Sequence, residues 1–368
     1  MPLISAHQVI LPDRIEPDAA VEVNHAGIIV GIGRATGSVD HHTLVPGLID
    51  LQVNGHDDVD VASARDGDWE RLDTLLLAQG VTAWCPTLVS APLDAYVGPL
   101  ARIAAAMGRP GLHPEILGAH LEGPFLGDKP GAHPTDLIVG VDRAWLDRLP
   151  STVALITAAA ECSDVGDLWA WAADRGIVAS VGHSAADAAG AVHAFDAGAR
   201  MVTHLFNAMS GMDHRSPGVA TAALLDDRVT AGLIADGVHV HPDLIRLAFQ
   251  VKGPERIALV TDAVGWRSGR VGRVSLSGDG TAPRLDDGTL AGSSLTLDRA
   301  IANVVAWGAT HLVGAVRAAS TTPADLIGRP DLGRIAPGAR ADLAALGPDG
   351  TCTSTWLAGE PVRSTAWT

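Results

Sequence analysis

The sequence predicts an α/β protein: a (β/α)8 TIM-like barrel with a small β-sandwich domain built from both chain termini. Three observations favour this fold. Short apolar runs alternate with helical stretches through the middle of the chain, eight such runs occur, and both ends lack helical periodicity. Buried strands that alternate with helices form a parallel sheet covered by helices, and a barrel needs eight such units. We place the small domain at 1–46 plus 333–368 and the barrel at 47–332.

The two ends of the chain are similar in composition. Residues 1–45 and the segment from 333 onward are rich in glycine, proline and β-forming residues. Such stretches are typical of short strands joined by turns. Because 368 residues exceed one ordinary domain, the ends are expected to form a unit beside the barrel.

The eight predicted barrel strands follow one another between residues 48 and 261. Helical stretches at 186–198 and 241–253 fit between strands, and a doubly wound parallel sheet is the alternative that this pattern leaves open. The strands are Leu48–Val53, Thr82–Leu88, Ile116–Leu121, Val153–Ala158, Ile177–Val181, Met201–Leu205, Val229–Ala235 and Ile257–Thr261.

The composition excludes disorder and disfavours polyanionic partners. Hydrophobic residues make up 47% of the chain, enough for a large core. The formal net charge is −16, with only two lysines, so binding of nucleic acid or an anionic membrane is not expected. Three scattered cysteines suit free thiols, and the first residues lack a signal peptide pattern. A cytoplasmic location is therefore expected.

Polar residues follow several predicted strands at their carboxyl ends. In a barrel these ends meet around one axis, where the active sites of this fold lie. Glu122, His183, His204 and Asp262 come from four different strands. A lone histidine or aspartate there is often structural, but burying all four together is costly without a cation. Two imidazoles and one carboxylate that leave room for water are typical of a catalytic metal site.

Asp262 then has a chemical role beside such a metal. A carboxylate next to activated water can accept its proton and later return it to the leaving group. The pattern therefore predicts hydrolysis of an amide or a related acyl bond.

Longer motifs resemble a known family. VPGLID at 45–50 and GRIAPGARADL at 333–343 resemble the two flanking motifs of the amidohydrolase superfamily. More narrowly, six further motifs resemble the N-acetylglucosamine-6-phosphate deacetylase family, in that family's order and over nearly the whole chain. They are HLEGPFL at 120–126, GHS at 182–184, THLFNAM at 203–209, DGVHV at 236–240, TDA at 261–263 and AGSSLTLD at 291–298.

The resemblance implies the reaction and the residues that carry it. It implies hydrolysis of N-acetylglucosamine 6-phosphate, a small amino-sugar phosphate, to glucosamine 6-phosphate and acetate, by a homodimer. It further implies that Glu122, His183 and His204 bind the metal, that Asp262 is the catalytic acid/base, and that His133 polarises the acetyl carbonyl.

The resemblance also implies substrate contacts. Asn207, the backbone of Ala208, and Arg215 match a phosphate-binding element, and His239 matches a histidine that contacts the sugar phosphate. The backbone around Leu295 is expected to face the acetyl group. An arginine suits a phosphate on chemical grounds as well, because its guanidinium donates two parallel hydrogen bonds.

The end of the first strand departs from the wider superfamily. Many members carry His-x-His there and hold a second metal, whereas this chain has Gln52 and Asn54. Neutral amides are poor ligands for zinc-like ions. We therefore expect one divalent metal per subunit, Zn²⁺ first and Fe²⁺, Co²⁺ or Mn²⁺ as alternatives. Gln52 and Asn54 are expected to be substrate-binding residues that hydrogen-bond in the pocket.

Other functions stay open. The chain could be a metal-dependent deacylase of another N-acyl sugar or of an N-acyl amino acid, a deaminase, or an inactive barrel that acts as a scaffold. The loop at 127–131 could be a lid or a plain surface loop. His120 is expected in the core, and His56, His193 and His241 on the surface.

Overall fold

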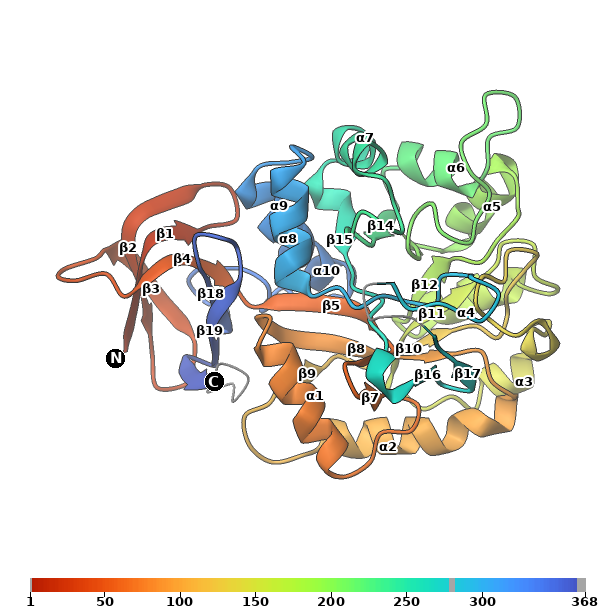
Figure 1. Ribbon diagram of the computed structural model, residues 1–368, viewed down its shortest axis with the longest axis horizontal. Helices are drawn as coiled ribbons and strands as arrows, with labels where there is room; N and C mark the ends of the chain where they lie inside the picture. The colour runs from red at the N-terminus through yellow and green to blue at the C-terminus, as the bar shows by residue number, and fades with distance from the viewer. Residues whose placement is uncertain (1, 278–281, 363–368) are drawn as a thin grey trace.

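The structure is a computed structural model that describes residues 2–277 and 282–362. Eight parallel strands of the middle of the chain lie side by side in sequence order, which confirms the predicted barrel (Figure 1). A short strand, β9 (Glu115–Ile116), pairs with the second of them. The eight are β5 (Leu48–Val53), β8 (Val81–Val89), β10 (Ala119–Glu122), β11 (Val153–Ala158), β12 (Val178–Val181), β13 (Met201–Val202), β14 (Thr230–Leu233) and β15 (Ile257–Leu259).

The barrel closes just beyond β15. The backbone N–H of Asn54 donates to the carbonyl oxygen of Ala263 at 2.8 Å, and the N–H of Asp262 donates to that of Gln52 at 2.9 Å. Val53 and Ala263 form an isolated parallel bridge. Residues at the ends of the first and last strands therefore make the seam of the barrel.

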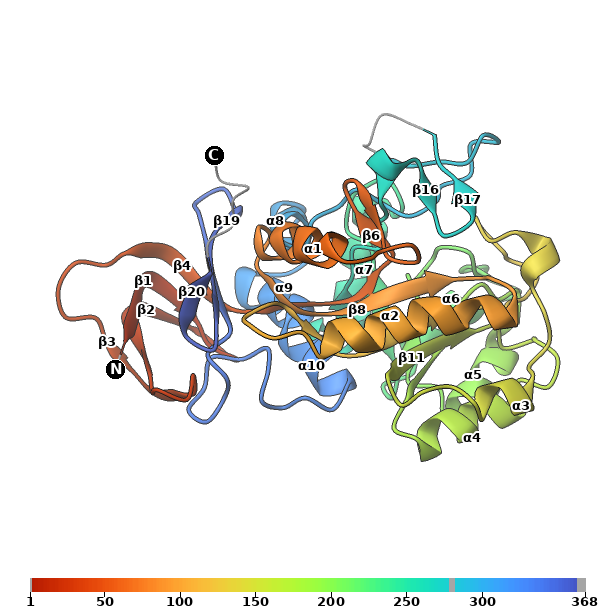
Figure 2. The ribbon, with the colours of Figure 1, turned by 90° about the horizontal axis from the view of Figure 1, so that it is seen from below.

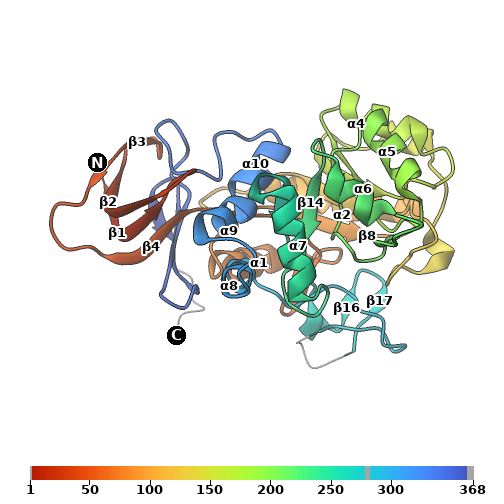
Figure 3. The ribbon, with the colours of Figure 1, turned by 90° about the horizontal axis from the view of Figure 1, so that it is seen from above.

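Helices cover the outside of the barrel (Figures 2 and 3). Of the described residues, no helix has the length and apolar character needed to cross a membrane. The helices are α1 (Gly67–Leu77), α2 (Val97–Met107), α3 (Arg143–Leu146), α4 (Gly166–Asp174), α5 (Ala188–Ala197), α6 (Val219–Leu225), α7 (Pro242–Lys252), α8 (Leu297–Ala306), α9 (Leu312–Ala319) and α10 (Thr321–Leu326).

Helix α7 shows how the sequence places these helices. Pro242 occupies its first turn, where a missing N–H costs nothing. Gly253 ends it with φ +71°, a conformation that favours glycine. Its buried residues, Ile245, Ala248, Phe249 and Lys252, recur at helical spacing and face the barrel. The predicted helices at 186–198 and 241–253 are confirmed as α5 and α7.

Both chain ends form the predicted separate β unit, which lies on the left in Figure 1. Strand β4 leads directly into β5 and pairs with β18, so the two chain ends meet beside the start of the first barrel strand. The boundaries at 46/47 and 332/333 stay a prediction. The sheet order is β20 (Glu360–Val362), β19 (Cys352–Leu357), β18 (Leu343–Leu346), β4 (His41–Pro46), β1 (Leu3–Ile10), β2 (Ile15–Val23) and β3 (Ile29–Arg34).

A chain of hydrogen bonds crosses the barrel interior. His120 on β10 places Nδ1 3.0 Å from the carbonyl oxygen of Leu51, which can only accept, so Nδ1 donates. Its Nε2 lies 2.8 Å from the Thr157 hydroxyl, which contacts Thr203 at 2.7 Å, and Thr203 contacts Ser180 at 2.6 Å. All of these side chains are buried. His120 is thus a paired core residue, as expected.

Candidate metal and active site

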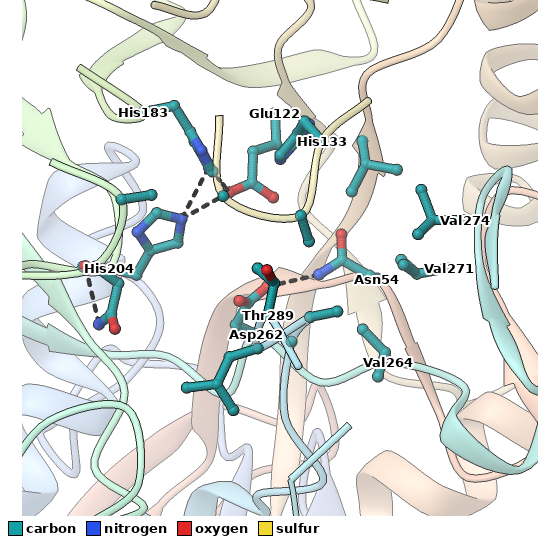
Figure 4. A pocket seen from close by; sticks show the side chains of 18 of the residues that line it. Asn54, Glu122, His133, His183, His204, Asp262, Val264, Val271, Val274 and Thr289 are labelled. Carbon is teal, nitrogen blue, oxygen red and sulfur yellow. Dashed lines mark hydrogen bonds and ion pairs between the residues drawn. The ribbon is translucent and has the colours of Figure 1, made fainter. Parts of the chain in front are cut away.

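A cavity of about 400 Å³ opens at the carboxyl ends of the barrel strands (Figure 4). The hairpin of β16 (Arg270–Val271) and β17 (Val274–Ser275), seen at the top of Figure 2, contributes Val271 and Val274 to its wall. Most of the predicted site residues line this one cavity. They are Asn54, Glu122, His133, His183, His204, Asn207, Ala208, His239 and Asp262.

Three of these side chains converge on one point, as the dashed lines in Figure 4 show. Glu122 Oε1 lies 3.1 Å from His183 Nε2 and 2.9 Å from His204 Nε2, and the two nitrogens lie 3.1 Å apart. Two ligands of a tetrahedral zinc ion with bonds of ~2.0–2.1 Å are separated by about 3.3 Å. The triangle therefore has close to the size of a metal-ligand set, and all three residues are buried.

The protonation of His183 indicates that this triangle suits a cation. Its Nδ1 lies 3.2 and 3.1 Å from the carbonyl oxygens of Lys129 and Pro130. Since these oxygens can only accept, Nδ1 carries the proton of the neutral ring. The lone pair of Nε2 then points at an oxygen of Glu122, another acceptor. Two acceptors repel unless a positive charge lies between them, so the cluster is chemically suited to a divalent metal.

The backbone is strained where these side chains turn inward. His183, His204 and Asp262 have φ values of +51°, +32° and +50°. A side-chain-bearing residue in this left-handed region costs roughly 1–2 kcal/mol. Such residues persist where the surrounding structure holds them and cluster at functional sites. Each lies two or three residues beyond its strand, where the chain bends toward the barrel axis.

Two amides from β5 and its end hold the second carboxylate. Gln52 Nε2 donates to Glu122 Oε1 at 3.0 Å and to Asp262 Oδ1 at 3.1 Å, so one amide group bridges both carboxylates. Asn54 Nδ2 donates to the same oxygen of Asp262 at 2.7 Å. Gln52 is fully buried and does not line the cavity, whereas Asn54 does. Both amides hydrogen-bond in the site, as expected.

The two carboxylates have opposite proton affinities. Burial opposes ionisation of Glu122, but hydrogen bonds from His183 and His204, when protons rather than a metal ion lie between these nitrogens and the carboxylate, hold its pKa well below the usual range. Burial, and then the negative charge of Glu122, raise the pKa of Asp262 well above its usual range. A cation held by the triangle would favour the ionised form of both. Carboxyl groups whose pKa values are pushed apart are typical of acid/base sites.

His133 lies at the edge of the triangle. Its ring centroid is 4.4 Å from that of His183, and its pKa is lowered to about 3, mainly by burial. Atoms of Glu122, His133 and His183 all lie within 4.8 Å of one another, so His133 could join a ligand set on distance alone. We favour His204 as the third ligand, because its Nε2 is closer and His133 Nδ1 contacts Ser90 at 2.8 Å.

Three of the predicted phosphate contacts, His239, Asn207 and Ala208, line the cavity. His239 Nδ1 lies 2.6 Å from Asp236 Oδ2, and its Nε2 has no hydrogen-bond partner among the residues that the structure describes. Although burial opposes it, the hydrogen bond from His239 lowers the pKa of Asp236. Asn207 donates to the carbonyl oxygens of His204 and Leu205 at 3.3 Å. Ala208 has φ +46°, another strained turn at the cavity wall.

Besides Gln52, two further predicted contacts do not line the cavity. Arg215 lies in an exposed stretch, 211–217, of the long connection between β13 and α6. Its backbone N–H donates to Asp213 Oδ1 at 2.8 Å, and its guanidinium has no hydrogen-bond partner among the described residues. Leu295 is buried in the core ahead of α8, and its N–H donates to the hydroxyl of Ser293 at 3.0 Å. Sequence spacing does not reveal the path of a loop, and the substrate contacts of Arg215 and of the backbone around Leu295 stay predictions.

Sequence reasoning missed several residues of the cavity. Arg284, Thr289 and Leu290 line it from the segment between Asp262 and α8. No recognised motif falls between 264 and 290, where these three residues lie, so only the position of this stretch between two motifs could have pointed to it. His56 was expected on the surface, but both of its ring nitrogens are buried without a partner among the described residues.

The loop at 127–131 is fastened to the site. The Glu161 carboxylate accepts from the N–H of Asp128 at 3.3 Å, and the N–H of Gly127 donates to the carbonyl oxygen of His183 at 3.0 Å. A Cβ on Gly127 would lie 2.0 Å from a Glu161 oxygen, so a larger residue there would displace the Glu161 carboxylate from this contact. The loop therefore supports a candidate ligand and is more than a plain surface loop.

Comparison with known proteins agrees with this geometry. A model of the amidohydrolase family matches residues 43–362. An N-acetylgalactosamine-6-phosphate deacetylase of Escherichia coli O157:H7 is 35% identical, covering 91% of this chain and 92% of that protein. An N-acetylglucosamine-6-phosphate deacetylase of Bos taurus is 36% identical, covering 87% and 83%.

Solved structures give the same result. The N-acetylglucosamine-6-phosphate deacetylase of Thermotoga maritima superposes with a TM-score of 0.91 at 29% identity, covering 98% of this chain and 99% of that one. A mutant of the Mycobacterium smegmatis enzyme in complex with N-acetyl-D-glucosamine-6-phosphate gives 0.90 at 33% identity, covering 98% of both chains.

Proposed function

The chain belongs to the amidohydrolase family, and from this premise we propose that it hydrolyses N-acetylglucosamine 6-phosphate to glucosamine 6-phosphate and acetate. One observation carries the proposal. A buried triangle of Glu122, His183 and His204 lies beside Asp262, which amides fix in place, in a single cavity. This arrangement suits hydrolysis of an uncharged amide, which needs both an electrophile and a proton carrier.

The proposed enzyme binds one divalent metal ion per subunit. Zn²⁺ is the first candidate, and Fe²⁺, Co²⁺ and Mn²⁺ are the alternatives. When bound, such an ion lowers the pKa of water and polarises a carbonyl oxygen. Glu122, His183 and His204 would hold it. Gln52 and Asn54 supply neutral amides where a second ion would need stronger ligands, which supports a single ion.

Asp262 acts as the proton carrier. Its Oδ1 is held by two amide donors, from Gln52 and Asn54, which fix the carboxylate in the cavity. It accepts a proton from the attacking water and returns it to the amine nitrogen as the C–N bond breaks. Across the cavity, His133 polarises the acetyl carbonyl by hydrogen bonding.

The phosphate is bound at the side of Asn207, Ala208 and His239 in the proposal. Arg215 can reach a phosphate only if its loop moves or if a second copy of the chain presents it, because it does not line its own cavity. Arg284 does line the cavity, and its guanidinium is a second candidate for binding the phosphate. The backbone near Leu295 is the proposed neighbour of the acetyl group.

A second substrate has direct support. The E. coli O157:H7 relative, 35% identical over nearly the whole chain, is an N-acetylgalactosamine-6-phosphate deacetylase. The two sugars differ only in the orientation of one hydroxyl group, far from the acetyl group that reacts. N-acetylgalactosamine 6-phosphate is therefore the alternative substrate.

Acetate release from four compounds tests the proposal: both acetylated sugars, each with and without the 6-phosphate, supplied to zinc-loaded protein. The expected result is the highest kcat/KM on N-acetylglucosamine 6-phosphate. Preference for the galactose epimer would select the alternative, and no turnover of either phosphate ester would refute both. Arg284→Ala and Arg215→Ala, measured side by side, should raise KM for the phosphate ester alone if each contacts the phosphate.

Assembly and location complete the proposal. We expect a homodimer in the cytoplasm. Cys85, Cys162 and Cys352 are buried free thiols, which suits a reducing compartment. Sedimentation at micromolar concentration would test the dimer, and cell fractionation would test the location.

A further inference from the structure

His133 is held by one neighbour through two contacts. Its Nδ1 lies 2.8 Å from the hydroxyl oxygen of Ser90, and the backbone N–H of Ser90 donates to the same nitrogen at 3.3 Å. Ser90 directly follows β8 and is buried. The only other hydrogen bond of His133 among the described residues joins its backbone N–H to the carbonyl oxygen of Pro130, at 3.1 Å.

These two contacts determine where the ring carries its proton. A backbone N–H can only donate, so Nδ1 must offer a lone pair to it. That long contact, at 3.3 Å, disfavours the tautomer protonated at Nδ1 and the imidazolium ion, and the shorter contact to the hydroxyl decides between the tautomers. The Ser90 hydroxyl then also donates to Nδ1, and the single ring proton resides on Nε2. Of the described residues, none accepts a hydrogen bond from Nε2, and the ring lines the cavity.

We propose that Ser90 is a positioning residue that fixes His133 as the neutral tautomer with its proton on Nε2, directed into the cavity. This inference rests on the proposed function, in which His133 must donate to the oxygen of the acetyl carbonyl. With the proton on Nδ1, the same ring would present a lone pair to that oxygen and repel it. Ser90 acts through His133 and does not itself touch the substrate.

The local packing supports a specific place for the Ser90 hydroxyl. A Cβ added to Gly123, the residue after Glu122, would lie 2.4 Å from Ser90 Oγ. Gly123 has φ +90°, which itself favours glycine. The absence of a side chain at position 123 leaves the space that the hydroxyl occupies, so one glycine connects the end of β10 to the orientation of His133.

The direct test is nitrogen NMR of ¹⁵N-histidine-labelled, zinc-loaded protein, with the His133 signals assigned from a His133→Asn variant. The wild type is expected to show a protonated Nε2 and an unprotonated Nδ1. Ser90→Ala is expected to show a mixture of tautomers, because only the weaker backbone donor remains. A protonated Nδ1 in the wild type would overturn the proposal.

Kinetics separate positioning from a structural role. Ser90→Ala should lower kcat on the order of tenfold, less than the 10²–10³ typical of losing an oxyanion donor, with KM and zinc content unchanged. Ser90→Thr should restore kcat, because it keeps the hydroxyl. If Ser90→Ala alters neither the tautomer nor kcat, the inference is wrong. If the tautomers behave as expected but no sugar phosphate is hydrolysed, the proposed function fails while the tautomer assignment stands.

Discussion

Two polar layers lie inside the barrel: an upper layer around Glu122 at the carboxyl ends of the strands, and a lower layer around His120, deeper in the barrel. They differ in whether their polar atoms are paired with other protein atoms. In the lower layer, His120, Thr157, Thr203 and Ser180 form a hydrogen-bond chain that ends on a carbonyl oxygen, so each polar atom of the chain has a partner. In the upper layer, acceptors face one another around Glu122, and His204 Nδ1 is buried without a partner among the described residues.

The difference shows what distinguishes a site from a core. Both layers are buried, and both contain histidine, so neither burial nor residue type separates them. The lower layer balances donors and acceptors among protein atoms alone. The upper layer does not, because it holds an excess of acceptors that only a cation or a bound molecule can neutralise. An imbalance of this kind marks the upper layer as functional.

Removing one ligand from the upper layer should have the largest effect. His183→Ala deletes one corner of the triangle, so zinc content and acetate release should be lost together. Elemental analysis and the acetate assay on the same sample measure both. His193→Ala, on the exposed face of α5, is the matched control and should keep both. A His183→Ala protein that retained full zinc would exclude His183 as a ligand.

Removing the proton carrier should leave the triangle intact. Asp262→Asn preserves shape and an oxygen for the Asn54 amide, but it cannot accept a proton. We expect zinc content near that of the wild type and a loss of kcat of about 10²–10⁴-fold. Activity within tenfold of the wild type would assign the proton transfer to another group.

In the lower layer, burial of His120 should make the stability of the protein depend on pH. Burial lowers the pKa of His120 to about 4 from an unfolded value of 6.5. As pH falls from 6.5 toward 4, the unfolded chain gains a proton on His120 that the folded chain does not. The free energy of unfolding therefore stays at its full value above pH 6.5 and falls as the pH is lowered through this range, by about 3 kcal/mol at most. Urea unfolding of wild type and His120→Gln at both pH values measures it. Parallel stability curves for the two proteins would contradict the assignment.

A substitution inside the hydrogen-bond chain should cost somewhat less. Thr203→Val keeps the shape but leaves the buried hydroxyls of Ser180 and Thr157 short of a partner, which should lower the free energy of unfolding by about 2 kcal/mol. Thr221→Val on α6 is the control, because the buried Thr221 hydroxyl has no partner among the described residues and its removal should cost little. Equal losses in both variants would show that the chain adds no stability.

The sequence predicts the strands and the four central residues for different reasons. Apolar runs such as Val153–Ala158 encode strands locally, and the carboxyl ends of parallel strands must meet, which brings Glu122 and Asp262 together. The contacts of Gln52 and Ser90 depend on strand register and loop path, which no short motif encodes. Arg215 illustrates the limit, because its place in the sequence does not reveal that its loop is exposed.

Because the barrel closes through its last strand, its parts become complete in a fixed order as the chain is synthesised. All three proposed ligands precede residue 205, whereas Asp262 and the segment that closes the barrel come almost sixty residues later. A nascent chain that ends before β14 has an open sheet edge at β13, and Gln52 has no Asp262 to hold. The proposed proton transfer thus becomes available only at closure, so a truncated product of an interrupted ribosome would carry the three proposed ligands without Asp262.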